Sequence, residues 1–393
     1  MSEVANHSVI SALLRVMARE FRCIVCHWLY PLCMIGMPLF GMLFYATMLQ
    51  EGLPERIPTA VVDCDNSSLS RSFIRDLQAQ QSLEIVQQYT SYVEARNAMQ
   101  RNEIYGFLLI PSLFEALVMD GKQPAISFYT NDAYLIPGSL LYECYSTQST
   151  LASADIVEGV LNSLGVSQQR ILSLLQPLAV DLQALGNSRI NYSIYLTNSF
   201  IPTLLQLMIL LVTIYAFTSE IKHESVRAWV FAARGSLPVA VVGKILVYAI
   251  IFCVEGLLLQ SLLYGYMHFP LQSPWWQMSL AMILMVAASM SIVVIVLSLV
   301  PSVSVSYSIV SVIGVVSFSL GGFSYPVSDM YLPFKILTNL LPARHYFLIY
   351  VNNALNGYPL YYCRWQYVAL LIFVIAALFS LPRLCGVIAR NNR

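Results

Sequence analysis

The sequence predicts a polytopic α-helical membrane protein with six transmembrane helices and an inserted α/β extracytoplasmic domain. Of its 393 residues, 58% are hydrophobic and only 11% are charged, whereas a soluble domain averages about 25% charged residues. Apolar segments long enough to cross a bilayer recur along the chain. A polar stretch in which short apolar strands alternate with helices separates the first of these segments from the others, which predicts the inserted domain.

Residues 1–27 are predicted to form a cytoplasmic amphipathic helix at the membrane interface. Arg15, Arg19 and Arg22 fall on one face, and apolar residues recur at helical spacing on another, a pattern typical of interfacial helices. A plain cytosolic tail is the alternative. Residues 28–49 carry no charge and are too long for the apolar region of a signal peptide. They are therefore expected to form the first transmembrane helix, an uncleaved anchor kinked at Pro31 and Pro38.

Residues 50–193 are predicted to form the extracytoplasmic α/β domain. Two of its cysteines, Cys64 and Cys144, could pair if the domain lies in an oxidising compartment. No glycine-rich phosphate loop, HExxH or G-x-S-x-G motif occurs in the chain, which argues against an enzyme active site. The predicted strands are 57–63, 83–89, 105–110, 125–129 and a returning strand at 178–185, and the predicted helices are 73–80, 93–101, 136–164 and 167–175.

Residues 194–393 are predicted to form a five-helix transmembrane domain. Two connections are distinctive: a charged loop at 219–238, and an aromatic segment at 325–364 that we expect to form re-entrant or interfacial helices. The serines and glycines of the span 303–323 favour close helix packing, either at a dimer interface or within one subunit. The five predicted spans are 194–218, 239–264, 275–300, 303–323 and 365–381.

Basic residues in the short flanks set the expected orientation, because they favour the cytoplasmic side. With the N-terminus inside, the aromatic segment faces outward with few cations, and both termini and the loop 219–238 face the cytoplasm. The inner side then holds Arg15, Arg19, Arg22, Lys222, Arg227, Arg234, Lys244, Arg383, Arg390 and Arg393, and the outer side, apart from the large domain, only Lys335, Arg344 and Arg364.

Three local motifs carry a resemblance to a known family. Residues 60–71 (A-V-V-D-C-D-N-S-S-L-S-R) are similar to the pattern A-V-V-D-x-D-x-S-x-x-S-R. Residues 220–238 align with a cytoplasmic segment usually written E-x-x-x-G-T, followed by a proline, and here we place Ser225-Val226 at the Gly-Thr position. Residues 341–346 (L-P-A-R-H-Y) look like N-P-x-R-Y. Together with the order of spans, these motifs resemble the permease subunit of type-2 ABC exporters, in the branch with a large domain between the first two spans.

The resemblance implies a bacterial inner-membrane efflux permease for amphipathic or hydrophobic small molecules. It implies a cytoplasmic ABC ATPase, a second permease copy or paralogue, and often a periplasmic adaptor protein with an outer-membrane channel. The chain itself lacks a Walker A motif: its nearest match, Gly235 with Gly243-Lys244, has Ile245 where a Ser or Thr is needed. No cofactor is expected on this chain, and ATP-Mg would bind the partner subunit. The zero net charge disfavours nucleic-acid binding.

Candidate site residues follow from the charged loop and the spans. Glu220, Glu224, Arg227 and Trp229 are predicted to couple the permease to the ATPase, as an amphipathic helix seated in a groove would do; a solvated connector is the alternative. Glu255 is an acidic residue within a span, where a charge costs roughly 2.5–3.5 kcal/mol. It could gate the path, bind a cationic substrate, titrate, or serve as a structural carboxyl.

Tyr346, Phe347 and Tyr350 are candidates for an outer gate, although an interfacial aromatic belt also explains them. No metal ligand set is predicted. Two other function classes stay open at this point: a non-transporting receptor or interaction protein with a large external domain, and a secondary carrier. A carrier would be expected to show paired broken helices in two repeats, and the sequence shows no such pairing.

Overall fold

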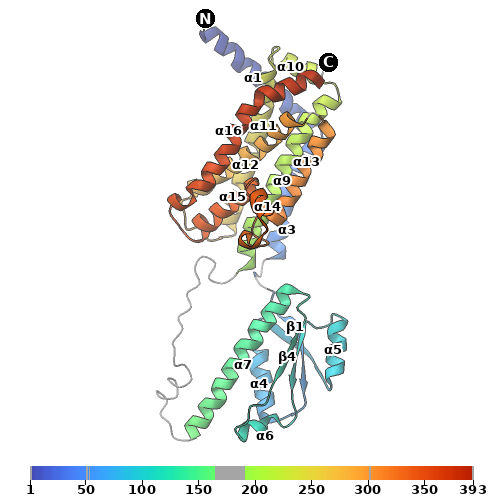
Figure 1. Cartoon of the computed structure of the whole chain (residues 1–393), viewed down its shortest axis with the longest axis vertical. Helices are drawn as coiled ribbons and strands as arrows, with labels where there is room; N and C mark the ends of the chain where they lie inside the picture. The colour runs from blue at the N-terminus through green and yellow to red at the C-terminus, as the bar shows by residue number, and fades with distance from the viewer. Residues whose placement is uncertain (1, 50–51, 53, 164–190, 301, 392–393) are drawn as a thin grey trace. The chain divides into compact units, whose positions relative to one another are not determined.

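The chain divides into two compact units, a helical unit (Met1–Gly52 and Ala184–Arg393) and a sheet unit (Leu53–Gln183) (Figure 1). The structure is a computed structural model, and it describes residues 2–49, 52, 54–163, 191–300 and 302–391. The predicted helix 167–175 and returning strand 178–185 lie outside these residues. The sheet unit is inserted between two neighbouring points of the helical unit, since Tyr192 N–H donates to the Gly52 carbonyl at 3.2 Å.

Six helical segments of the described chain are long and apolar enough to cross a membrane, which agrees with the number predicted. The first span contains a π-helical turn beside Pro31, as expected where a proline cannot donate its backbone N–H. The spans are α2 (Leu29–Pro31) continuing through that π turn (Leu32–Gly36) into α3 (Met37–Met48), α9 (Tyr192–Lys222), α11 (Leu237–Gln260) with a π turn (Ser261–Tyr266), α12 (Trp275–Leu299), α13 (Val303–Leu320) and α16 (Leu360–Asn391).

The N-terminal helix α1 (Ser2–Cys26) packs against the helical unit. Val16 is fully buried and lies against Gly243 of α11, where an added Cβ would come within 2.9 Å of the valine side chain. Leu14 and Phe21 on another face are more than half exposed. The helix therefore has one face in the protein and an apolar face left for lipid.

Short helices make up the two connections that the sequence distinguishes. The loop between α9 and α11 contains α10 (Val226–Ala232). The aromatic segment folds into a 3₁₀ turn (Val327–Asp329), α14 (Leu332–Thr338), α15 (Pro342–Ile349) and a π-helical turn (Tyr350–Leu355).

The sheet unit contains a four-stranded mixed sheet in the order β2-β1-β3-β4. Strand β1 is parallel to both β2 and β3, whereas β4 is antiparallel to β3. One apolar core packs α4 and α7 on one face of the sheet, and a smaller core packs α5 on the other. The strands are β1 (Ile57–Asp63), β2 (Leu83–Tyr89), β3 (Gly106–Ile110) and β4 (Ser127–Thr130), and the helices are α4 (Ser68–Gln78), α5 (Tyr92–Gln100), α6 (Phe114–Met119) and α7 (Leu135–Ser163).

The loop after β1, which carries the most specific of the motifs, is held by its own carboxylates. Asp63 accepts the backbone N–H groups of Asp65 and Asn66, each at 3.0 Å, and the Ser70 hydroxyl at 2.7 Å. Asp65 accepts the Phe114 N–H at 3.0 Å and so fixes the start of α6. Both carboxylates thus accept hydrogen bonds from the protein itself, Asp63 within the loop and Asp65 from α6, so the motif explains the local fold.

The two cysteines of the sheet unit do not pair in this structure. Cys64 follows β1 and is exposed, whereas Cys144 is buried on α7, and both thiols are free. The disulfide suggested by the sequence is therefore absent. The residues lie in different environments, at a loop surface and inside the core, which spacing along the chain could not reveal.

We expect Asp63→Ala to destabilise the sheet unit by about 1–3 kcal/mol, because the hydroxyl of the buried Ser70 loses its acceptor, as do two backbone N–H groups of the loop. Thiol labelling of buried Cys144 during urea titration of the full chain, followed by mass spectrometry, measures this change. Glu84→Ala on the exposed surface of β2 is the matched control. Equal labelling midpoints for the two variants would contradict the structural role of Asp63.

Candidate functional site

Four charged side chains from three helices meet where α1 packs beside the ends of α9 and α11. We call this set, Arg19 and Glu20 of α1, Glu220 of α9 and Lys244 of α11, the Lys244 cluster. Glu20 is 1% exposed and Lys244 is 2% exposed, so the charges are removed from solvent. The described part of the chain contains no group of three metal-ligating side chains.

The Lys244 ammonium lies between two carboxylates. Its Nζ is 2.9 Å from Oε2 of Glu20 and 3.0 Å from Oε1 of Glu220, and it also donates to the Ala216 carbonyl at 3.1 Å. Arg19 donates to both carboxylate oxygens of Glu220, at 2.6 and 3.0 Å. Such a two-point contact fixes direction as well as distance. The cluster therefore joins α1, α9 and α11 with no net charge.

Burial and pairing act in opposite directions on these groups. Burial alone would lower the pKa of Arg19, but the hydrogen bond and the charge of Glu220 outweigh burial and raise that pKa. The guanidinium thus stays charged at any pH that the protein meets. The ammonium of Lys244 also lies 4.9 Å from the ring centre of Trp229, within the range of a cation–π contact. Through this contact Trp229 connects α10 to the Lys244 cluster.

The backbone turn between α9 and α10 explains the E-x-x-x-G-T pattern. Ser225 N–H donates to the Glu220 carbonyl at 3.0 Å, and Glu224 between them has a φ of 54°. This arrangement is a helix C-terminal turn whose left-handed position usually holds glycine. Glu224 thus occupies the glycine position and Ser225 the threonine position, so the sequence-based placement on Ser225-Val226 is wrong by one residue. The Ser225 hydroxyl donates to the Glu220 carboxylate, as threonine also can.

Helix α10 has two distinct faces. Val226 and Trp229 are buried against the helical unit, and Trp229 has no exposed surface. Arg227 is exposed on the other face, as is Phe231, whose side chain is 84% exposed. Glu224 is also exposed at the start of this loop. The short helix is thus anchored on one side and presents charged and aromatic groups on the other.

The four residues predicted to couple to the ATPase therefore lie in two places. Glu224 and Arg227 are on the surface of the α10 loop, whereas Glu220 and Trp229 are buried beneath it. A direct contact with a partner is available to the first pair. Glu220 and Trp229 can affect coupling only indirectly, because they fix the position of α10. Their role in coupling stays a prediction.

Glu255 lies in α11, well away from the Lys244 cluster, and is 6% exposed. Neither of its carboxylate oxygens has a hydrogen-bond partner among the residues that the structure describes. A Cβ added at the adjacent Gly256 would come within 2.7 Å of Met282 of α12 and 3.3 Å of Leu205 of α9, so apolar side chains pack closely beside this turn. A buried polar group without a partner reduces stability, and in a membrane protein such a group is a candidate for function.

The three gate candidates hold helices together in this structure. Tyr346 is 1% exposed, and its hydroxyl accepts a hydrogen bond from Gln260 Nε2 at 2.9 Å. Tyr350 is fully buried and donates to the Ile194 carbonyl at 2.9 Å. Phe347 packs edge-on against two other aromatic rings. These contacts connect α15 and the following π turn to α9 and α11, and a gating role stays a prediction.

Small residues of α13 divide between two faces. Gly314 lies against α9, where an added Cβ would come within 2.5 Å of Leu207. Ser317 accepts a hydrogen bond from Gln206 of α9 at 2.8 Å. Ser304 and Ser308 are exposed on the other side of the helix. Packing within one subunit therefore explains part of the small-residue pattern and leaves the exposed part unexplained.

The pairing that makes the Lys244 cluster was not predicted from the sequence. Lys244 was predicted among the cytoplasmic charges, and Arg19 on the basic face of the N-terminal helix. One signal was available: Lys244 falls inside a predicted span, and an ammonium in that position needs a carboxylate partner. Glu20 stands among the three arginines of the amphipathic N-terminal stretch, and could have been proposed as that partner.

The family comparison agrees with this architecture. The model of the ABC-2 family transporter protein matches residues 28–381, which include all the predicted spans. The chain belongs to this family, and it is a multi-pass membrane permease of an ABC transporter. In this family ATP is hydrolysed by a separate ATPase subunit. A comparison with curated proteins returns no match. Membership of this family argues against the two alternative functions, a non-transporting receptor and a secondary carrier.

We expect Lys244→Met to lower the free energy of unfolding by about 3–5 kcal/mol, because it leaves a buried carboxylate uncompensated. Adding Glu20→Gln restores a neutral cluster and should recover part of this loss. Unfolding of the purified protein in mixed detergent micelles measures both variants. A double variant less stable than Lys244→Met would show that packing, and not charge balance, governs the site.

The contrast between Glu220 and Glu255 gives a second test. Glu220→Leu removes a paired carboxylate and should cost about 3–5 kcal/mol. Glu255→Leu removes a buried group that has no partner and should raise the free energy of unfolding by about 1–3 kcal/mol. The same unfolding assay compares the two. A large loss of stability in Glu255→Leu would mean that Glu255 is a structural carboxyl with a bonded partner.

Proposed function

We propose that this permease is an exporter of amphipathic or hydrophobic small molecules, driven by a cytoplasmic ABC ATPase that binds the exposed face of α10. The observation that carries the proposal is the anchoring of α10. Trp229 and the Lys244 cluster hold its inner face, while Phe231 and Arg227 project from its outer face. A partner that moved this outer face would move α1, α9 and α11 together.

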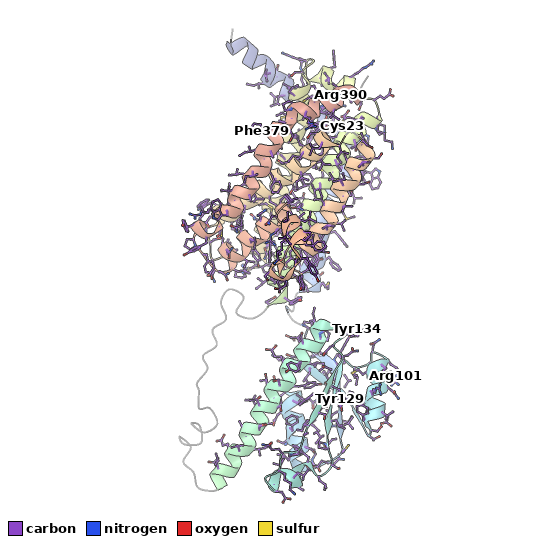
Figure 2. The ribbon with its side chains drawn as sticks, viewed as in Figure 1. Cys23, Arg101, Tyr129, Tyr134, Phe379 and Arg390 are labelled. Carbon is purple, nitrogen blue, oxygen red and sulfur yellow. The ribbon has the colours of Figure 1, made fainter. Side chains whose placement is uncertain are left out.

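The orientation that we propose places both termini and α10 in the cytoplasm. In Figure 1 the two termini and α10 lie toward one end of the helical unit, and Figure 2 shows Cys23 of α1 and Arg390 of α16 toward that same end. Positive charge there supports a cytoplasmic location. Exposed cations of α1, α10, α16 and the end of α9 are Arg15, Arg22, Lys222, Arg227, Arg383 and Arg390.

The sheet unit is then extracytoplasmic, since it is inserted between the first and second spans. We propose the bacterial cytoplasmic membrane as the location of the permease. The sheet unit is the part of this chain that a periplasmic adaptor, and through it an outer-membrane channel, could reach. Two observations support an extracytoplasmic sheet unit: its insertion between the first two spans, and the distribution of basic residues in the short flanks.

We also propose that the permease works as a dimer with a second copy or a paralogue. The exposed face of α13 supports this interface. Ser304, Ser308, Val312 and Val315 recur at helical spacing and are exposed. Small side chains let helices approach closely within a membrane, and the buried face of α13 is already occupied by α9.

Substitution of the outer face of α10 tests the coupling proposal. Phe231→Ala combined with Arg227→Glu should reduce the amount of ABC ATPase that co-purifies with the permease about tenfold, as expected for loss of an aromatic anchor and a charge. Mass spectrometry identifies the ATPase by its Walker A peptide. The unfolding stability of the permease should stay unchanged, because neither side chain is buried.

Phe379→Ala is the matched control, since Phe379 is 82% exposed on α16 and projects away from the helical unit (Figure 2). It should leave the yield of ATPase unchanged. Wild-type yield in the α10 variant would contradict the proposed docking face. An equal loss of co-purified ATPase in both variants would mean that exposed aromatic side chains in general, and not α10 in particular, determine how much ATPase is recovered.

A further inference from the structure

A cavity of about 640 Å³ opens within the sheet unit between α4, α6 and the second half of α7. The first half of α7 packs on the sheet, where Leu141 and Tyr145 are buried. In the second half the residues from Ala152 to Gly159, and Leu161, are half-buried or exposed. The groove thus follows from a long helix that packs closely over only part of its length.

The floor of the groove is apolar and aromatic. Phe73 of α4 and Phe114 of α6 line it, together with Ile126 next to β4 and Ile156 of α7. The two phenylalanines are also part of the core of the sheet unit, so the floor is fixed in place. Small-molecule sites are commonly 300–1,000 Å³ in volume, with mostly apolar walls and a few polar groups. The size and lining of the groove match that class.

The polar groups of the groove give it a negative character. Asp76 of α4 and Asp155 of α7 line it from two different helices, and both are exposed. Neither forms an ion pair or hydrogen bond within the described residues. The lining cation, Lys122, is paired with Asp120 at 3.2 Å. Two carboxylates therefore remain without a countercharge beside an apolar floor.

We propose that this groove binds a small organic cation with an apolar body, whose positive group lies by Asp76 and Asp155. The charge of the walls favours a cation, and the phenylalanine floor favours an apolar or aromatic body. This inference extends the proposed export function. Only the idea that the bound ligand is the transported substrate rests on that proposed function. Binding itself requires neither ATPase nor transport.

Equilibrium dialysis with tetraphenylphosphonium tests the proposal on the full chain in phosphatidylcholine nanodiscs, after subtraction of uptake by empty nanodiscs. The variant Asp76→Asn with Asp155→Asn should weaken binding about tenfold, because it removes two solvent-accessible charge contacts. Neutral triphenylphosphine oxide should bind the variant and the wild type equally. Ala152→Trp, which fills the groove, should reduce binding of both probes.

The matched control is Glu84→Gln with Glu143→Gln, which removes two exposed carboxylates of the same unit outside the groove and should leave binding unchanged. Three results would overturn the proposal: wild-type affinity for tetraphenylphosphonium in the Asp76 and Asp155 variant, an equal loss in the control, or unchanged binding in Ala152→Trp. If Ala152→Trp lost binding of both probes while the Asp76 and Asp155 variant bound both like the wild type, the groove would select apolar surface without regard to charge, which would also overturn the proposal. Each failure leaves the ATPase-docking test of α10 unaffected.

Discussion

Burial of four charged side chains at one end of the helical unit is the constraint on which the rest of this structure depends. Lys244 is 2% exposed within an apolar helix, and an unpaired ammonium there would be strongly unfavourable. Glu20 and Glu220 neutralise it, and Arg19 balances the second carboxylate. Because the partners come from α1, α9 and α11, charge balance requires these helices to keep one relative position.

This requirement gives the loop that contains α10 its proposed function. A short helix such as α10 has little stability of its own, but Trp229 packs over the Lys244 ammonium and is fully buried. The loop is therefore part of the folded bundle and not a solvated tether. A force applied at Phe231 would reach three helices through buried contacts, as ATP-driven movement of a permease requires. Glu255 differs from the cluster because its carboxylate is buried without such compensation.

The sequence predicted the architecture well because hydrophobic periodicity determined it. The spans were found because length and apolarity decide which helices can cross a bilayer, and the strands β1 to β4 because short apolar runs ended at turn residues. Pairing between distant residues was not predictable in the same way. Arg19 and Glu220 are 201 positions apart, and nothing local in either segment identifies the other. The left-handed backbone at Glu224 was also missed, because the Gly-Thr pair of the motif was placed one residue too far along and glutamate at position 224 gives no sign of its own of a conformation that usually requires glycine.

Site-specific photocross-linking from α10 tests the central claim most directly. A photoreactive amino acid at position 231, in permease purified with its ATPase from native membranes, should form an adduct with the ATPase. The same amino acid at Tyr361, which is 62% exposed at the start of α16, should form none. This result would place the ATPase on the face of α10 that the Lys244 cluster supports. Adducts from position 361 and none from position 231 would contradict the account.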